Sequence, residues 1–203
     1  MKAPPLNDER AGLFVSTAPT IEEEYMTTKH IMGAAQMDAA ILKTAKSIVR
    51  RNKKMEDIAL IGIRSRGVPL AFWLAKKIGQ ILKKDIPVGS LDINLYRDDL
   101  SEVDVHPVVR KTELPFSIEG KGIILVDDVL YTGRTIRAAL DALIDFGRPK
   151  FVQLAVMVDR GWRELPIQAD YVAKKLKTSA GENVKVLLVD MDGMNQVVVK
   201  GKE

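Results

Sequence analysis

The sequence predicts an α/β protein built on a mostly parallel, twisted sheet that is flanked by helices. Short apolar runs, typical of buried strands, alternate along the chain with amphipathic segments of helical period, and this alternation is characteristic of parallel sheets. Polar turns follow three of the apolar runs, and parallel sheets bind their ligands at the carboxyl ends of the strands. The 203 residues suffice for one such domain with an appendage.

The expected elements follow from hydrophobic period and from turn signals. Helices are expected at residues 34–52, 68–82 and 134–146. Strands are expected at 58–63, 88–94, 123–126, 151–158, 169–172 and 184–189, with an edge strand at 197–199.

In the first half of the chain, the first helix has a clear period, because Ile41, Ala45 and Ile48 recur on one face. The strand after it is continuously apolar, as in a strand buried on both faces. The second helix tolerates Pro69 in its first turn, and the following strand alternates apolar and polar residues. Residues 96–115 are polar and contain two prolines, so they are predicted to form a loop or a hairpin, and a connection of this length is usually functional or disordered.

In the second half, four apolar residues before Asp127 predict another buried strand. The third helix has Gly147 as its C-terminal stop and Pro149 just beyond it. The next apolar run ends at the polar turn 159–163, and the remaining strands are short and late. Residues 1–26, rich in proline and acidic side chains, are expected to be an irregular extension before a domain at 27–203.

The composition excludes several classes of protein. No apolar run approaches the roughly 18 residues that span a bilayer, and no signal peptide is recognisable, so a cytoplasmic protein without a membrane partner is expected. The absence of cysteine excludes disulfides and thiolate metal sites, and with two histidines a zinc site is not expected. The net charge of +4 does not require nucleic acid but is compatible with a local basic face.

The stretch Val-Asp-Asp-Val-Leu-Tyr-Thr-Gly-Arg-Thr, residues 126–135, indicates the ligand. Its turn leads into a helix, where exposed N–H groups and the helix dipole favour an anion, and its threonines add hydroxyl donors. Asp127 and Asp128 supply acceptors just upstream. Donors for a phosphate beside acceptors for hydroxyls match a sugar phosphate. The plainer interpretation is a strand-to-helix turn in which Asp128 caps the helix.

The same stretch resembles the phosphoribosyl-pyrophosphate (PRPP) signature of type I phosphoribosyltransferases. The neighbouring motifs Leu-Tyr-Arg-Asp-Asp at 95–99 and Asp-Arg-Gly-Trp-Arg-Glu-Leu-Pro at 159–166 are similar to those of the PyrR family, bifunctional pyrimidine operon regulators and uracil phosphoribosyltransferases. The resemblance runs from about Thr27 to Val199 and leaves residues 1–26 without a counterpart. It implies the type I fold with a small hood and a flexible cover loop.

The resemblance implies a role for each motif residue. The acidic pair would bind the ribose hydroxyls and catalyse transfer together with Arg66 and Arg97. The turn of Ser65, Arg66 and Gly67 would bind pyrophosphate, with a strained peptide bond expected between Ser65 and Arg66. The nucleotide loop would comprise Val129, Leu130, Tyr131, Thr132, Gly133, Arg134 and Thr135. Arg97 would reach pyrophosphate from the cover loop. The plainer interpretation of Ser65, Arg66 and Gly67 is an ordinary polar turn. The plainer interpretation of Arg97 is a solvated arginine.

Uracil would lie beside Val158, Asp159 and Arg160, although an ion pair that shapes the turn explains the last two residues equally well. The implied reaction is loss of pyrophosphate from PRPP through an oxocarbenium-like transition state, with attack by uracil N1 to give UMP. Mg²⁺ is the expected cofactor, held mainly through PRPP and with no dedicated protein ligand.

The family also binds messenger RNA of the pyrimidine operon in response to UMP, which requires a basic face. The candidate RNA-contacting residues are Lys43, Lys46, Arg50, Arg163 and Lys174, with Lys54 continuing the helical stripe. A merely solvated face explains the stripe as well. This sequence departs from the family with Trp162 and Lys46 where histidine is usual, and with Gln168 where arginine is usual.

Three functions therefore stay open: a uracil phosphoribosyltransferase with or without RNA regulation, a phosphoribosyltransferase for a purine or orotate, and a nonenzymatic RNA-binding regulator. The resemblance also implies a homodimer or a higher assembly of dimers. Phe72, Trp73 and Leu74 could contribute to a core or to such an interface.

Overall fold

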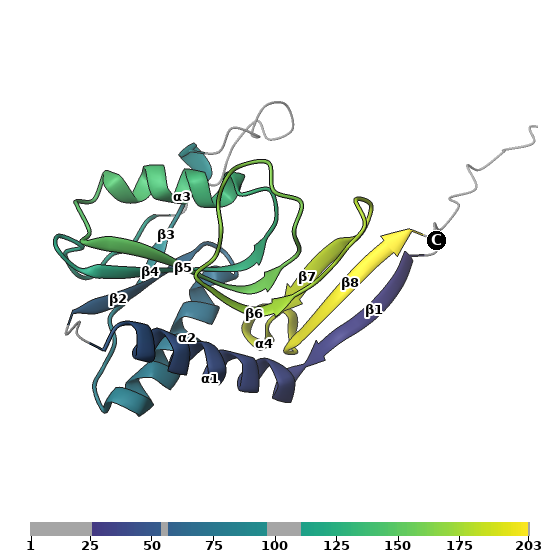
Figure 1. Ribbon diagram of the computed structural model, residues 1–203, viewed down its shortest axis with the longest axis horizontal. Helices are drawn as coiled ribbons and strands as arrows, with labels where there is room; N and C mark the ends of the chain where they lie inside the picture. The colour runs from purple at the N-terminus through teal and green to yellow at the C-terminus, as the bar shows by residue number, and fades with distance from the viewer. Residues whose placement is uncertain (1–25, 54–56, 97–110, 203) are drawn as a thin grey trace, which may run out of the picture.

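In the computed structural model, which describes residues 26–53, 57–96 and 111–202, five parallel strands form the main sheet in the order β3-β2-β4-β5-β6 (Figure 1). The strands are β2 (Ile58–Ile63), β3 (Val88–Leu91), β4 (Gly122–Leu130), β5 (Phe151–Asp159) and β6 (Tyr171–Lys175). Their strictly parallel pairing confirms the predicted sheet, and β4 lies at its centre.

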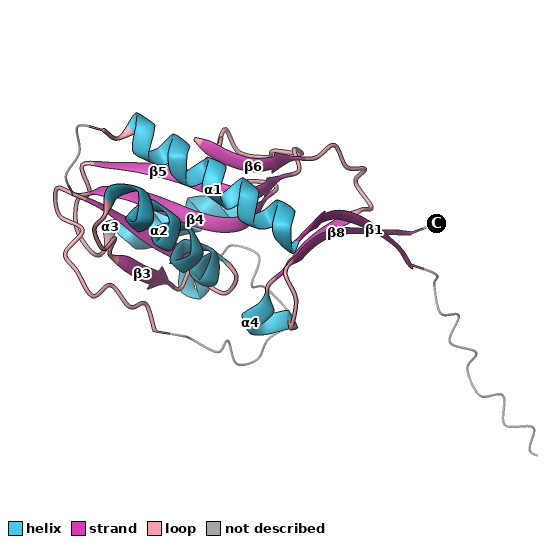
Figure 2. Ribbon diagram, turned by 90° about the horizontal axis from the view of Figure 1, so that it is seen from below, coloured by secondary structure: helices cyan, strands magenta, loops and turns pink. Residues whose placement is uncertain are grey.

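Helices cover both faces of this sheet, as predicted. The helices α1 (Ala34–Arg51) and α2 (Gly67–Leu82) pack on one face, and α3 (Arg134–Ile144) packs on the other (Figures 1 and 2). A short 3₁₀ helix, η1 (Asn94–Tyr96), follows β3. None of the helices in the described segments is both long and apolar enough to cross a membrane.

A second, smaller sheet forms a hood beside the carboxyl ends of the main strands. Its strands are β1 (Met26–Gly33), β7 (Asn183–Leu187) and β8 (Gln196–Lys202), and the short helix α4 (Val189–Asp192) joins the last two. The prediction of β8 as an edge strand was wrong, because β8 pairs with both β1 and β7 and is the central strand. The strand β1 was not predicted, because its residues Thr27 to His30 are exposed and carry no apolar alternation.

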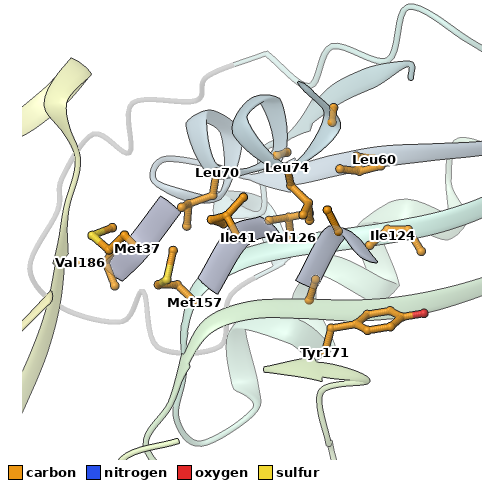
Figure 3. Close-up of a cluster of buried hydrophobic side chains, with 14 of the residues drawn as sticks. Met37, Ile41, Leu60, Leu70, Leu74, Ile124, Val126, Met157, Tyr171 and Val186 are labelled. Atoms are coloured by element: carbon orange, nitrogen blue, oxygen red, sulfur yellow. The ribbon is translucent and has the colours of Figure 1, made fainter. Parts of the chain in front are cut away.

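The core on the α1–α2 face joins the two sheets (Figure 3). Met37 and Ile41 of α1 meet Leu70 and Leu74 of α2 over the central strands, and Val186 of the hood strand β7 belongs to the same cluster. Burying such apolar side chains stabilises the fold by about 1.5–3 kcal/mol each. The hood is therefore held by the same core that fixes the main sheet.

The boundary of β4 differs from the prediction in a way that matters for the site. The strand was expected to end at Val126, but its pairing with β5 continues from Asp127 to Leu130. The acidic pair thus lies within the strand and is held by its ladder. Smaller corrections apply to β3, which ends at Leu91, to α3, which ends at Ile144, and to β6, which begins at Tyr171.

Candidate functional site

The acidic pair lies at the carboxyl end of the central strand β4. Asp127 is buried, with 6% of its surface exposed, and its Oδ1 accepts a hydrogen bond from the backbone N–H of Asp128 at 2.9 Å. Asp128 Oδ1 accepts from the N–H of Val129 at 2.8 Å. These local bonds fix the rotamer of each carboxylate, so that both are pre-organised as acceptors.

The environment of Asp128 disfavours its charge. Burial raises the pKa of its carboxyl group, and the Val129 N–H and the positive charge of Arg66 offset only part of that effect. A carboxylate held against this cost, at the edge where parallel sheets bind ligands, is a candidate for a functional group.

The turn after β4 presents an open helix N-terminus. Gly133 occupies the N-cap position of α3 with φ of +98°, a backbone conformation that side chains rarely adopt, and it makes no side-chain capping bond. A Cβ on Gly133 would come within 3.3 Å of Leu165 Cβ. The alternative in which Asp128 caps this helix was therefore wrong. A helix N-terminus that begins at a glycine, with the Thr132 hydroxyl beside it, can bind a phosphate.

Within this turn, Thr132 Oγ1 accepts from the backbone N–H of Arg134 at 3.3 Å. The Arg134 guanidinium pairs with Glu164 at 2.7 Å in an exposed position. Thr135 lies in the first turn of α3, two residues after Gly133. The predicted phosphate-binding residues are therefore gathered around one helix start.

The predicted uracil-binding residues lie across from that turn. Val158 and Arg160 are buried, and the Arg160 guanidinium stacks over the Tyr131 ring at 4.1 Å. The Asp159 carboxylate accepts from the N–H of Gly161 at 3.0 Å and from Arg163 at 2.6 Å. These bonds favour the ion-pair interpretation for the side chain of Asp159, while its backbone remains at the edge of the site.

The predicted pyrophosphate turn is packed tightly against β4. A Cβ on Gly67 would lie 2.4 Å from the carbonyl oxygen of Val126, so glycine is required there. A non-proline cis peptide bond is present, but at Arg64–Ser65, one bond before the predicted position. Arg66 donates to Val186 O at 2.8 Å and to Asp192 at 2.9 Å, which ties this turn to the hood.

The candidate RNA-contacting residues divide into two groups. Lys43, Lys46 and Arg50 are exposed on α1, opposite its buried face, and Lys174 is exposed on the neighbouring strand β6. The α1–β6 junction is held by an ion pair between Arg51 and Asp170 at 2.7 Å. Arg163 is different, because its guanidinium is directed at the nucleotide turn rather than at solvent. Arg97 and Lys54 lie outside the described residues.

Two residues that contribute to the site were not predicted from the sequence. Asp192 holds Arg66 from 126 residues away, and no sequence signal marked it. Glu164 pairs with Arg134 and donates its backbone N–H to Thr132 O; its place in the Asp-Arg-Gly motif could have pointed to it. No cluster of three potential metal ligands occurs in the described ranges, and the carboxylate pair fits an ion that keeps most of its ligands from substrate and water.

This chain is similar to known proteins that carry a phosphoribosyl transferase domain. The model of the phosphoribosyl transferase domain matches residues 32–190. The bifunctional protein PyrR of Deinococcus deserti is 57% identical over 82% of this chain and 91% of its own. The bifunctional protein PyrR of Thermus thermophilus is 54% identical, over 85% of this chain and 96% of the length of that relative.

Among solved structures, the hypoxanthine phosphoribosyltransferase of Trypanosoma cruzi has a TM-score of 0.66 at 19% identity, covering 86% of this chain and 97% of that chain, and this likeness concerns the fold. Both the domain match and the identity to the PyrR relatives extend over most of the chain. The chain belongs to the phosphoribosyl transferase domain family and, within it, to the family of bifunctional PyrR proteins.

Proposed function

We propose that this protein is a uracil phosphoribosyltransferase, forming UMP and pyrophosphate from uracil and PRPP, and that it also binds pyrimidine-operon messenger RNA in response to UMP. The observation that carries the enzymatic half is the placement of the buried Asp127 and the half-buried Asp128 directly before the N-terminus of α3. That arrangement offers acceptors for ribose hydroxyls beside donors for a 5-phosphate.

Each group of residues binds a different part of the substrates. Asp127 and Asp128 accept from the 2- and 3-hydroxyls, and the loop from Val129 to Thr135 binds the 5-phosphate. The turn of Ser65, Arg66 and Gly67 lies against β4 and binds pyrophosphate. Uracil lies beside Val158, Asp159 and Arg160, at the carboxyl end of β5.

The reaction needs little covalent help from the protein. The bond from the anomeric carbon to pyrophosphate breaks with its electron pair on the leaving group, and uracil N1 attacks the opposite face of the oxocarbenium-like centre and loses its proton. Arg66, joined by Arg97 of the cover loop, balances the charge that develops on pyrophosphate. Mg²⁺, held mainly through PRPP oxygens and water, would supply further charge neutralisation when bound.

The regulatory half is supported by the exposed basic side chains Lys43, Lys46 and Arg50 of α1, continued by Lys174 of β6. Basic side chains on one face can follow a phosphate backbone. Trp162 is 53% exposed in the turn after β5 and can stack on an unpaired base. Because RNA, uracil and PRPP meet inside the cell, the proposal places the protein in the cytoplasm.

Self-association belongs to the same proposal, as a homodimer or a higher assembly of dimers. Trp73 is tied to Asp38 at 3.1 Å and Leu74 is buried, but Phe72 is 57% exposed in a groove of about 660 Å³ between α2 and α4. Val189 and Met191 add exposed apolar surface to that groove. Sedimentation velocity at micromolar concentration would test this, and a monomer there would contradict it.

An assay of base selectivity tests the enzymatic half. Uracil, hypoxanthine and orotate are each supplied with PRPP and Mg²⁺, and pyrophosphate release is followed. We expect release with uracil and at most about 1% of that rate with the others, since a site that hydrogen-bonds one base leaves groups unpaired with another. A preference for hypoxanthine or orotate would establish the enzyme for another base. No turnover, with UMP still bound, would favour a nonenzymatic regulator.

A further inference from the structure

Three successive carbonyl groups of the nucleotide loop face away from the ligand side, toward the turn that follows β5. Leu130 O and Tyr131 O accept from the Arg163 guanidinium at 3.3 and 2.7 Å. Thr132 O accepts from the backbone N–H of Glu164 at 3.0 Å. The turn thus provides a donor for each of these carbonyls.

The orientation of these carbonyls determines where the loop N–H groups point. In a trans peptide the N–H points opposite to the C=O of the same peptide unit. The cis bond recorded for the described residues is Arg64–Ser65, so the loop peptides are trans. The N–H groups of Tyr131, Thr132 and Gly133 therefore point away from the turn. They lie on the side of the loop that is left for an anion.

Arg163 is the side chain that holds this arrangement. Besides the two loop carbonyls, its guanidinium donates to Gly161 O at 3.0 Å, to Ile167 O at 2.9 Å and to the Asp159 carboxylate at 2.6 Å. Its side chain is 22% exposed. A guanidinium presents its N–H donors in a rigid planar fork that can serve these acceptors together, whereas the three donors of a lysine radiate from one nitrogen.

We infer that Arg163 is a positioning residue for the 5-phosphate subsite: it fixes the carbonyls of Leu130 and Tyr131 on the turn side and thereby aims the loop N–H groups at the phosphate. The inference rests on the proposed function of the loop. It assigns Arg163 a role in nucleotide binding in place of the direct RNA contact that the sequence suggested. The charge of Arg163 matters less, in this role, than the geometry of its donors.

The substitution Arg163→Lys tests the inference, because it keeps the charge and removes the fork. The affinities of UMP and of uridine, which lacks the phosphate, are measured by titration calorimetry on the full chain. We expect UMP affinity to fall about tenfold, equivalent to about 1.4 kcal/mol, and uridine affinity to change less than about twofold. The KM for PRPP should rise while the KM for uracil stays constant.

Two further variants sharpen the experiment. Arg148→Lys is the matched control, because Arg148 is exposed in the turn before β5, and it should leave both affinities unchanged. Arg163→Gln keeps two N–H donors without the charge and should lose at least as much UMP affinity as Arg163→Lys. All proteins are compared at a temperature at which circular dichroism reports them folded.

The possible results distinguish a failure of the inference about Arg163 from a failure of the proposed function. Unchanged UMP affinity in Arg163→Lys would overturn the inference, and so would an equal loss for UMP and uridine, because general damage does not discriminate by phosphate. If the wild-type protein makes no UMP from uracil and PRPP, the proposed function fails. The comparison of UMP with uridine would still decide the role of Arg163, since it requires binding alone.

Discussion

Asp128 illustrates how a single residue reveals the function, because the fold buries its carboxylate where burial is unfavourable. We expect Asp128→Asn to lower kcat/KM for PRPP by about 10- to 100-fold, the cost of about 1.5–3 kcal/mol that accompanies loss of a charged hydrogen bond. Asparagine preserves the shape and can still accept from the Val129 N–H, so circular dichroism should be unchanged. Wild-type kinetics in this variant would contradict the ribose assignment.

The same residue predicts a pH dependence of stability. Burial raises the folded-state pKa of Asp128 above its ordinary value of 3.8, so its contribution is fully present below that value and is lost as the pH rises through the folded-state pKa. Asparagine does not ionise. The free energy of unfolding of Asp128→Asn, relative to wild type, should therefore increase in urea titrations as the pH is raised above 3.8. A constant difference would argue against the raised pKa.

At the residue scale, the sequence predicts what is local and misses what is distant. Asp127, Asp128 and the loop up to Thr135 are contiguous, so their pattern alone suggested a sugar phosphate. Asp192 reaches Arg66 across 126 positions, and only the fold brings them together. Arg163 was identified as basic and assigned to RNA, because charge is visible in a sequence whereas the direction of a side chain is not.

At the scale of elements, the start of α2 is pressed against the end of β4. Gly67→Ala would place a Cβ 2.4 Å from the Val126 carbonyl oxygen, which is backbone and cannot simply rotate away. We expect a loss of about 1–3 kcal/mol in the free energy of unfolding and weaker pyrophosphate binding, because Arg66 moves with the helix. Gly181→Ala, where nothing lies within 4 Å of the added Cβ, is the control and should stay within about 0.5 kcal/mol.

The exposed face of α1 provides the second test at this scale. Lys46→Gln removes one cation from the proposed RNA face and should reduce the slope of log affinity against log salt by about 0.7 to 0.9. Lys83→Gln removes an equally exposed lysine at the end of α2 and should leave the slope unchanged. Equal slopes in both variants, measured by filter binding, would mean that the α1 stripe is merely solvated.

Hydrophobic period predicts the elements of the main sheet because their strands are buried on both faces, as the fully buried β2 shows. The strands of the hood were predicted less accurately than those of the main sheet. Residues Thr27 to His30 of β1 are exposed and lack apolar alternation. The strand β8 was predicted to be an edge strand because its two partners, β1 and β7, lie far from each other in the sequence. The end of β4 was misplaced for another reason: two carboxylates suggest that a strand has stopped, yet the ladder to β5 continues past them.

At the scale of the whole molecule, the nucleotide loop and the turn that carries Trp162 share one fixed point, the Arg163 guanidinium. Two sites that bias one element must influence each other reciprocally, so UMP and RNA should raise each other's affinity by the same factor. This gives the two proposed activities a common physical basis within one chain.

The central claim is that one protein both makes UMP and binds RNA in response to it. Its most direct test is a mobility-shift titration of pyrimidine-operon leader RNA, with and without UMP and at two salt concentrations, using a preparation that converts uracil and PRPP to UMP. The account predicts binding that UMP strengthens and that salt weakens steeply. Active enzyme without specific RNA binding would contradict it, and would indicate a salvage enzyme in which Trp162 and Gln168 mark the loss of regulation.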